Sequence, residues 1–249
     1  MVLCKILCKI TKNFWTIQKK AVILQTNKEK NMKLTHFRLA FVALWAFLTL
    51  NPLSARGDEM IVRCVAFYNL ENLFDTIHDE GKNDYEYLPD GGMKWTKFKY
   101  EQKVQNMAYA IAQLGTDEDP RGAAVVGVSE VENIGCLHDL CKELKEKHNR
   151  NYVPILLEGP DRRGIDVGLL YNPDMFKPVG QPKGYELKAH YADGGVVRSR
   201  LQLWVSGYML DDNRKIVMDK IHLSVNHWPS RSGGEESSRA TRDTAAMLC

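Results

Sequence analysis

Three polar residues of the 249-residue chain stand at the ends of apolar segments, where their side chains could do metal or acid–base chemistry. They are Asn69, Glu130 and His227. Side chains of a strand alternate between its two faces, so each of the three continues the face of the apolar residues found at every second position before it. Those residues are Val65 and Phe67 for Asn69, Ala124, Val126 and Val128 for Glu130, and Ile221, Leu223 and Val225 for His227. We therefore expect the three polar side chains at the rim of one core, where α/β proteins commonly bind ligands.

Each of these residues also has an ordinary structural explanation. Asn often begins a turn, a Glu can end a strand in solvent, and a single His is more often satisfied or exposed than catalytic. Their joint occurrence on three apolar faces favours a site. It does not name the reaction.

Asp166 is a fourth candidate because it opens an apolar strand, where a carboxylate needs a partner or the surface. A contact with His227 would fix the imidazole tautomer and raise the pKa of the imidazole. The alternative is that Asp161 and Asp166 pair with Arg162 and Arg163 in a solvated turn. The spacing leaves both interpretations open.

The turn after His227 is rich in hydrogen-bond donors, among them Ser230 and Arg231. These side chains could hold an oxyanion or a phosphate, and Asn226 joins them as a candidate for substrate binding. A loop with no ligand is the alternative. Other site classes are excluded, because Gly159–Gly164 lacks the Lys-Ser/Thr of a nucleotide-binding loop and the chain has no HExxH or GxSxG motif.

The hydrophobic pattern predicts the elements that would position these residues. Apolar residues at helical spacing predict a helix that Thr96 caps and Gly115 ends, and a second helix that ends near Asn149. The acidic segment 75–92 is expected to be a surface loop. Strands are expected at 61–69, 123–128, 152–157, 165–171, 185–190, 200–210 and 216–227, the last two forming a hairpin across 211–214.

The composition, 44% hydrophobic and 26% charged, is that of a globular protein. The net charge of +3 is uneven, with +8 in residues 1–55 and −5 in residues 56–249. A mildly acidic body argues against a broad basic face that grips nucleic acid. It does not argue against a phosphate hydrolase in which a metal supplies the positive charge.

Residues 32–55 are predicted to be a secretory signal peptide. Lys33 and Arg38 form a basic start, Leu39–Leu50 is apolar, and Leu53-Ser54-Ala55 offers a cleavage site. The apolar run of 12 residues is short of the roughly 20 that cross a bilayer. We therefore expect no permanent membrane span, and export to the periplasm or the cell exterior.

The remaining sequence divides into two parts. Residues 1–31 precede a good start Met and are interpreted as an over-extended start site, with a genuine basic extension as the alternative. Residues 56–249 are expected to form the folded domain. Its cysteines show neither a disulfide framework nor a structural zinc pattern; they are Cys64, Cys136, Cys141 and Cys249.

Four blocks follow one another along this domain: FYNLENLFD at 67–75, VSEVEN at 128–133, RGIDVGLLY at 163–171 and NHWPSRSGG at 226–234. In this order they resemble the endonuclease/exonuclease/phosphatase family, the deoxyribonuclease-like group, and particularly its exported bacterial members. The resemblance implies an α/β (α+β) fold, a four-layer sandwich of two mixed β-sheets flanked by helices. It also implies Mg²⁺-dependent hydrolysis of phosphoesters, with Mn²⁺ or Ca²⁺ as alternative metals.

The resemblance also implies roles for the matching residues. Glu130 would be the metal ligand, and Asn69 would orient the metal-water shell or the phosphate. His227 would act as general acid/base, oriented by Asp166. These roles suit the chemistry, because Mg²⁺ prefers carboxylates, waters and phosphate oxygens and a carboxylate-supported imidazole transfers protons near neutral pH.

The chain departs from the family pattern after Gly234. The family continues with an Asp-x-Asn block and a terminal Asp-His block, and the 15 residues that follow Gly234 contain neither. The chain is therefore interpreted as the N-terminal two-thirds of such an enzyme, incomplete at its C-terminus and with little or no activity of its own.

Two functional hypotheses follow. The leading one is an exported, monomeric, metal-dependent phosphodiesterase or nuclease. DNA, RNA, phospholipid head groups and sugar or inositol phosphates all stay open as substrates, since loops such as 75–92 would set specificity. The alternative is a catalytically inactive fragment, or a phosphate-binding or interaction module.

Overall fold

The computed structural model describes residues 4–7, 61–190, 194–231 and 234–248. The predicted signal peptide, 32–55, lies outside the described residues. In chain order the elements are β1 (Cys4–Leu7), β2 (Val62–Leu73), the 3₁₀ helix η1 (Tyr85–Tyr87), α2 (Lys97–Ala112), β3 (Val125–Val131), α3 (Ile134–His148), β4 (Val153–Leu156), β5 (Asp166–Tyr171), β6 (Phe176–Pro178), β7 (Lys183–Tyr185), β8 (Gln202–Met209), β9 (Ile221–Val225) and α4 (Glu235–Ala246).

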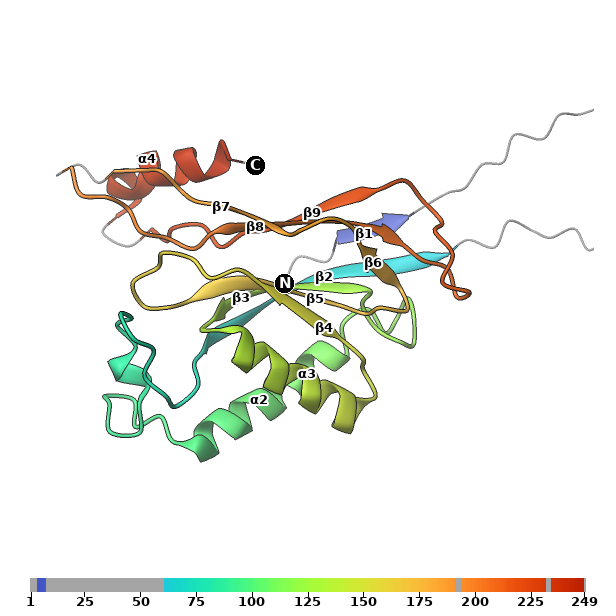
Figure 1. The fold of residues 1–249 in the computed structure, drawn as a ribbon, viewed down its shortest axis with the longest axis horizontal. Helices are drawn as coiled ribbons and strands as arrows, with labels where there is room; N and C mark the ends of the chain where they lie inside the picture. The colour runs from blue at the N-terminus through green and yellow to red at the C-terminus, as the bar shows by residue number, and fades with distance from the viewer. Residues whose placement is uncertain (1–3, 8–60, 191–193, 232–233, 249) are drawn as a thin grey trace, which may run out of the picture. The chain divides into compact units, whose positions relative to one another are not determined.

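The first sheet is mixed, with the strand order β1-β2-β3-β5-β4. β2 and β3 are parallel, and each of the other neighbouring pairs is antiparallel. Figure 1 shows α2 and α3 covering one face of this sheet, while the second sheet lies against the opposite face. The β2–α2–β3 crossover is the connection that places a helix on a sheet face and leaves two strands parallel.

The second sheet is antiparallel and is organised around β8. β6 and β7 pair with different parts of β8, and β9 pairs with residues 203–207. The predicted hairpin of the last two strands is confirmed, since β8 and β9 are antiparallel neighbours. The strand expected at 185–190 is shorter and earlier than predicted, because β7 ends at Tyr185.

The helices begin and end where the sequence pattern predicts. The Thr96 side chain accepts a hydrogen bond from the backbone N–H of Lys99 and caps α2. Asn149 follows α3 in the left-handed conformation, at φ 53°, which is a common way to end a helix. The inward face of α2 is apolar and buried; it consists of Tyr100, Val104, Ala108, Ile111 and Ala112.

Two apolar cores result from this layering. One lies between the helices and the first sheet and includes Val126, Val128 and Leu140. The other lies between the sheets and includes Val125, Val225 and partly buried Leu223. The layers confirm the predicted α/β sandwich of two sheets flanked by helices.

The helix α4 packs through Ala245 against a small apolar cluster of Leu187, Ala189 and Val197. Among the described residues, none of the helices has the length and apolar character that a membrane span requires.

Candidate functional site

Glu130 occupies a bulge in β3. Its neighbours Ser129 and Val131 pair with β2 and with β5, but Glu130 has no partner in either strand. Its backbone is left-handed, at φ 60°, a conformation that costs free energy for a residue with a side chain and that is often found at functional sites. An extra residue of this kind redirects a side chain at the end of a strand.

The bulge corrects the predicted alternation. Simple alternation places Glu130 on the face of Val126 and Val128, and those residues pack against the helices. Glu130 instead contacts His227, which follows β9 in the second sheet. The prediction for Glu130 was wrong about the face because the bulge interrupts the period of two; His227 does continue the inter-sheet face of Val225 and Leu223.

Gly127 explains how the two strands come together. A β-carbon at this position would lie 3.2 Å from the Phe67 ring and 3.3 Å from both Val225 methyl groups. Because Gly127 has no side chain, β9 can approach β3 closely at this point. The close approach brings His227, which follows β9, next to Glu130. A glycine within an apolar strand was the single sequence feature that pointed to this close approach.

The Glu130–His227 pair is the centre of the candidate site. The His227 Nε2 atom lies 3.5 Å from Glu130 Oε1, and the side chains are 27% and 19% exposed. His227 Nδ1 is buried, and no hydrogen-bond partner for it is found within the described segments of the chain. Burial and the nearby Arg200 guanidinium lower the pKa of His227, against the opposing effect of Glu130. His227 is therefore neutral at neutral pH, and can accept a proton.

Asn69 lies within β2, where the pairing of β2 with β3 becomes irregular. Its Oδ1 atom accepts a hydrogen bond from the Glu71 N–H at 2.8 Å, and Lys103 Nζ donates to the Glu71 carbonyl. Glu71 and Asn72 are both left-handed, at φ 52° and 59°. These contacts fix the amide with its oxygen engaged and its NH₂ group as the available donor.

Asp166 is buried, but its hydrogen-bond partner is not His227. Its Oδ1 atom accepts from the Gly159 N–H at 2.9 Å. Burial raises the pKa of Asp166 to about 7, although the Gly159 hydrogen bond opposes the shift. Within the described part of the chain no hydrogen bond or ion pair joins Asp166 to His227, so the expected carboxylate–imidazole contact is not made.

The remaining sequence candidates flank His227 in the chain. Asn226 Nδ2 donates to Ser224 Oγ at 2.9 Å, and Asn226 Oδ1 is buried without a partner. Ser230 is exposed. Arg231 is 71% exposed and pairs with Glu235, 3.8 Å away, at the start of α4. A role in substrate binding for these three residues stays a prediction.

The structure adds a charged group that the sequence interpretation missed. The Arg200 guanidinium is 8% exposed and lies 3.3 Å from Asp161; it also donates to the Trp228 carbonyl at 3.0 Å. Arg163 pairs with the same Asp161 carboxylate. The predicted solvated turn thus contains the Asp161–Arg163 pair, but Asp161 is buried. Nothing in the pattern distinguished Arg200 from other basic residues at strand ends.

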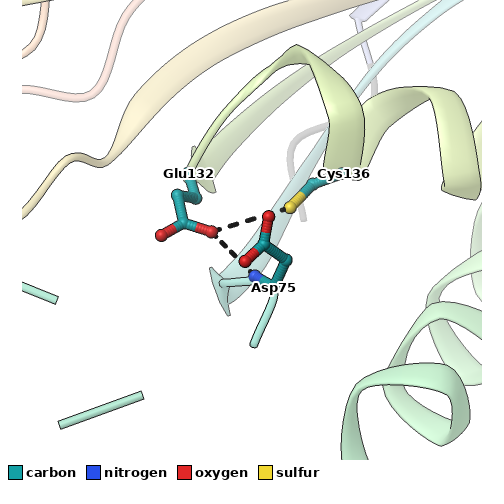
Figure 2. Close-up of side chains that lie close together, drawn as sticks. All are labelled: Asp75, Glu132 and Cys136. Carbon is teal, nitrogen blue, oxygen red and sulfur yellow. Dashed lines mark hydrogen bonds between the residues drawn. The ribbon is translucent and has the colours of Figure 1, made fainter. Parts of the chain in front are cut away.

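A second acidic group lies on the other side of the first sheet. Donor atoms of Asp75, Glu132 and Cys136 all lie within 4.8 Å of one another. Figure 2 shows Glu132 bonded to the Asp75 backbone N–H and to the Cys136 sulfur. The Asp75 carboxylate accepts from the Ile77 N–H and from Asn133 Nδ2. Glu132 lies between β3 and the N-cap of α3, outside the helix, so no helical spacing in the sequence signalled this group.

These two groups offer a divalent ion different donors. Burial raises the pKa of Glu132 to about 8 and that of the Cys136 thiol to about 12. The group also combines a soft sulfur with oxygens that already accept N–H bonds. Glu130 offers a hard, partly exposed carboxylate beside an imidazole, which suits Mg²⁺ with its shell of waters and phosphate oxygens. The donor chemistry therefore fits the metal at Glu130 better.

Solved structures to which this chain is similar include the following three. A conserved Enterococcus faecalis V583 protein of unknown function is 13% identical, with a TM-score of 0.41, 74% of this chain and 59% of that chain covered. An endonuclease/exonuclease/phosphatase family protein of Bacteroides thetaiotaomicron is 17% identical, with a TM-score of 0.35 and coverage of 60% and 44%. A mannosyl-6-phosphatase of Bacteroides thetaiotaomicron VPI-5482 is 16% identical, with a TM-score of 0.34 and coverage of 60% and 46%.

The chain thus spans about half the length of the solved structures it matches. A search of curated proteins found no match. The sequence model of the endonuclease/exonuclease/phosphatase family, however, matches residues 64–249, which include both sheets and the Glu130–His227 pair. The chain belongs to the endonuclease/exonuclease/phosphatase family.

Proposed function

We propose that the protein is a metal-dependent phosphoesterase, most directly a phosphodiesterase or nuclease, whose active site includes Glu130 and His227. The observation that carries the proposal is the 3.5 Å contact between these side chains. It joins the bulged end of β3 to the end of β9, two segments far apart in the sequence. Family membership supports the same class of reaction.

In this proposal Glu130 holds a divalent cation, Mg²⁺ in the first instance and Mn²⁺ or Ca²⁺ as alternatives. When bound, such an ion acts as a Lewis acid on a phosphoryl oxygen and offsets its negative charge. Glu130 suits this role because its carboxylate is partly exposed. The neighbouring His227, when neutral, competes only weakly with a cation for this carboxylate.

His227 would transfer the proton. Its pKa is lowered chiefly by burial, so the neutral imidazole is available at neutral pH to take a proton from an attacking water. Asn69 would orient the phosphate through its NH₂ group, because its carbonyl oxygen already accepts the Glu71 N–H. Asp166 would act at a distance, by fixing the turn at Gly159.

The substrate would be a phosphoester. A nucleic acid, a phospholipid head group or a sugar phosphate would each present the same phosphoryl group, and the loop 75–92 and the turn after His227 would select among them. Export, directed by residues 32–55, and a monomeric state belong to the same proposal.

Turnover measurements test the proposal. The purified full-length chain is assayed with bis-p-nitrophenyl phosphate and with plasmid DNA, with Mg²⁺ and with EDTA. We expect turnover, however slow, that requires the metal and that falls by about 100-fold or more in Glu130→Gln. Equal turnover in the wild type and in Glu130→Gln would contradict the proposed site. Metal binding without turnover would favour the alternative function, a phosphate-binding module.

A further inference from the structure

Two arginines beside the candidate site share a single carboxylate. Asp161 lies 3.3 Å from Arg163 Nε and 3.3 Å from Arg200 Nη1. The Asp161 and Arg200 side chains are 6% and 8% exposed, whereas Arg163 is 54% exposed. This group therefore carries one positive charge that its own carboxylate does not offset.

In a second arginine pair of the same molecule, carboxylates balance both positive charges. Arg63 and Arg121 each contact two carboxylates, Asp119 and Asp212. The hydrogen bonds that Arg121 donates to the Asp119 carboxylate raise the pKa of Arg121 above its usual range, despite burial. With two cations and two anions, this cluster has balanced charges and serves as an internal reference.

Arg200 shows the opposite behaviour. Burial lowers the pKa of Arg200, and the attraction of Asp161 does not make up the loss. Its Nε atom is buried and has no hydrogen-bond partner among the residues that the structure describes. A buried guanidinium N–H without an acceptor is costly, so this donor marks a place where an anionic acceptor would lower the free energy.

The position of Arg200 links it to the candidate site. Its Nη2 atom donates to the carbonyl of Trp228 at 3.0 Å, and Trp228 is the residue directly after His227. The other nearby carboxylate, Glu130, faces His227 and would be occupied by the metal in the proposed function. Glu130 is thus not available to balance the arginine pair during catalysis.

We propose that Arg163 and Arg200 form an oxyanion subsite that binds the phosphoryl oxygens of the substrate. The planar guanidinium fork matches phosphate geometry better than an ammonium does. Asp161 would hold both forks in place, with Arg200 as the fixed donor and the more exposed Arg163 closing over the ligand. This inference rests on the proposed function for its ligand, but not on metal binding.

The test uses inorganic phosphate without any metal. Full-length protein in EDTA is titrated with phosphate, and binding is followed by ³¹P line broadening. We expect saturable binding by the wild type and about ten-fold weaker binding by Arg163→Met, because one charge-assisted hydrogen bond or more is lost. Arg200→Lys keeps the charge but loses the fork, so we expect weaker binding there as well.

Two controls keep the result interpretable. Arg121→Met removes an arginine from the balanced cluster and should leave phosphate affinity unchanged. Because Arg163 is more than half exposed, Arg163→Met should fold even if Arg200→Lys does not, and circular dichroism checks both. No saturable binding by the wild type, or equal affinity in the wild type and a folded Arg163→Met, would overturn the subsite.

A competition arm separates a substrate subsite from a site for free phosphate. In EDTA, p-nitrophenyl phosphate should displace inorganic phosphate from the wild type. Independent binding of the two would overturn the assignment to substrate. The outcome is separable from the proposed function, because Glu130→Gln should lose metal-dependent turnover and still bind phosphate in EDTA.

Discussion

Glu130 lies within β3 and Glu132 directly follows that strand, yet the two carboxylates differ in burial and in hydrogen bonding. Glu130 is unpaired in the bulge, partly exposed and close to His227. Glu132 is 3% exposed, and its backbone N–H bonds to Leu73 while its carboxylate bonds to the Asp75 N–H. Glu132 has the strongly raised pKa, about 8, but it braces the junction of β2, β3 and α3. A perturbed pKa thus marks burial here, and exposure beside a histidine marks the candidate site.

The largest effect on turnover should come from substitution of His227, the residue that contacts Glu130. His227→Gln keeps the volume of the side chain but removes the titratable nitrogen beside Glu130. We expect metal-dependent turnover to fall by about 10²–10⁴-fold, with a melting temperature close to that of the wild type. Steady-state kinetics and thermal denaturation measure the two quantities. Undiminished turnover would mean that the contact between Glu130 and His227 is only structural.

The next effect concerns the buried member of the comparison. Glu132→Ala leaves the Asp75 N–H without its acceptor and opens a cavity beside Cys136. We expect the free energy of unfolding to fall by about 2–4 kcal/mol at pH 5, measured by urea denaturation. The matched change Glu130→Ala at the partly exposed rim should cost less than about 1 kcal/mol. Equal losses of unfolding free energy in Glu132→Ala and Glu130→Ala would contradict the difference between the buried and the partly exposed carboxylate.

A pH dependence of stability should follow from the buried carboxylate of Glu132. Because the folded-state pKa of Glu132 is raised from 4.5 to about 8, its favourable contribution is complete below pH 4.5 and is lost as the pH rises through about 8. Glu132→Gln stays neutral, so in EDTA its stability should exceed that of the wild type increasingly over this range, by on the order of 2 kcal/mol at pH 8. Parallel pH profiles for Glu132→Gln and the wild type would count against the buried charge.

The smallest effect should come from Asn69 at the edge of the candidate site. Asn69→Asp retains an acceptor for the Glu71 N–H but loses the NH₂ donor and adds negative charge. We expect KM for bis-p-nitrophenyl phosphate to rise about five- to ten-fold, with a change in unfolding free energy below about 0.5 kcal/mol. An unchanged KM would remove Asn69 from the site.

The sequence predicted the features that local patterns determine. The Thr96 cap, the end of α3 near Asn149 and the β8–β9 hairpin are each set by neighbouring residues, and each is confirmed. The bulge at Glu130 could not be predicted, because it depends on the pairing of β3 with two other strands. The Arg200–Asp161 contact was missed for a similar reason, since it joins residues 39 positions apart through tertiary packing.

Metal binding by matched variants tests the central claim most directly. Mn²⁺ binding is measured by electron paramagnetic resonance in the wild type, Glu130→Gln and Glu132→Gln, each at pH 7 and checked for folding. The account predicts that Glu130→Gln loses the bound Mn²⁺ and that Glu132→Gln retains it with nearly the wild-type affinity. Loss of Mn²⁺ in Glu132→Gln with retention in Glu130→Gln would place the metal at the buried Asp75, Glu132 and Cys136 group and contradict the account.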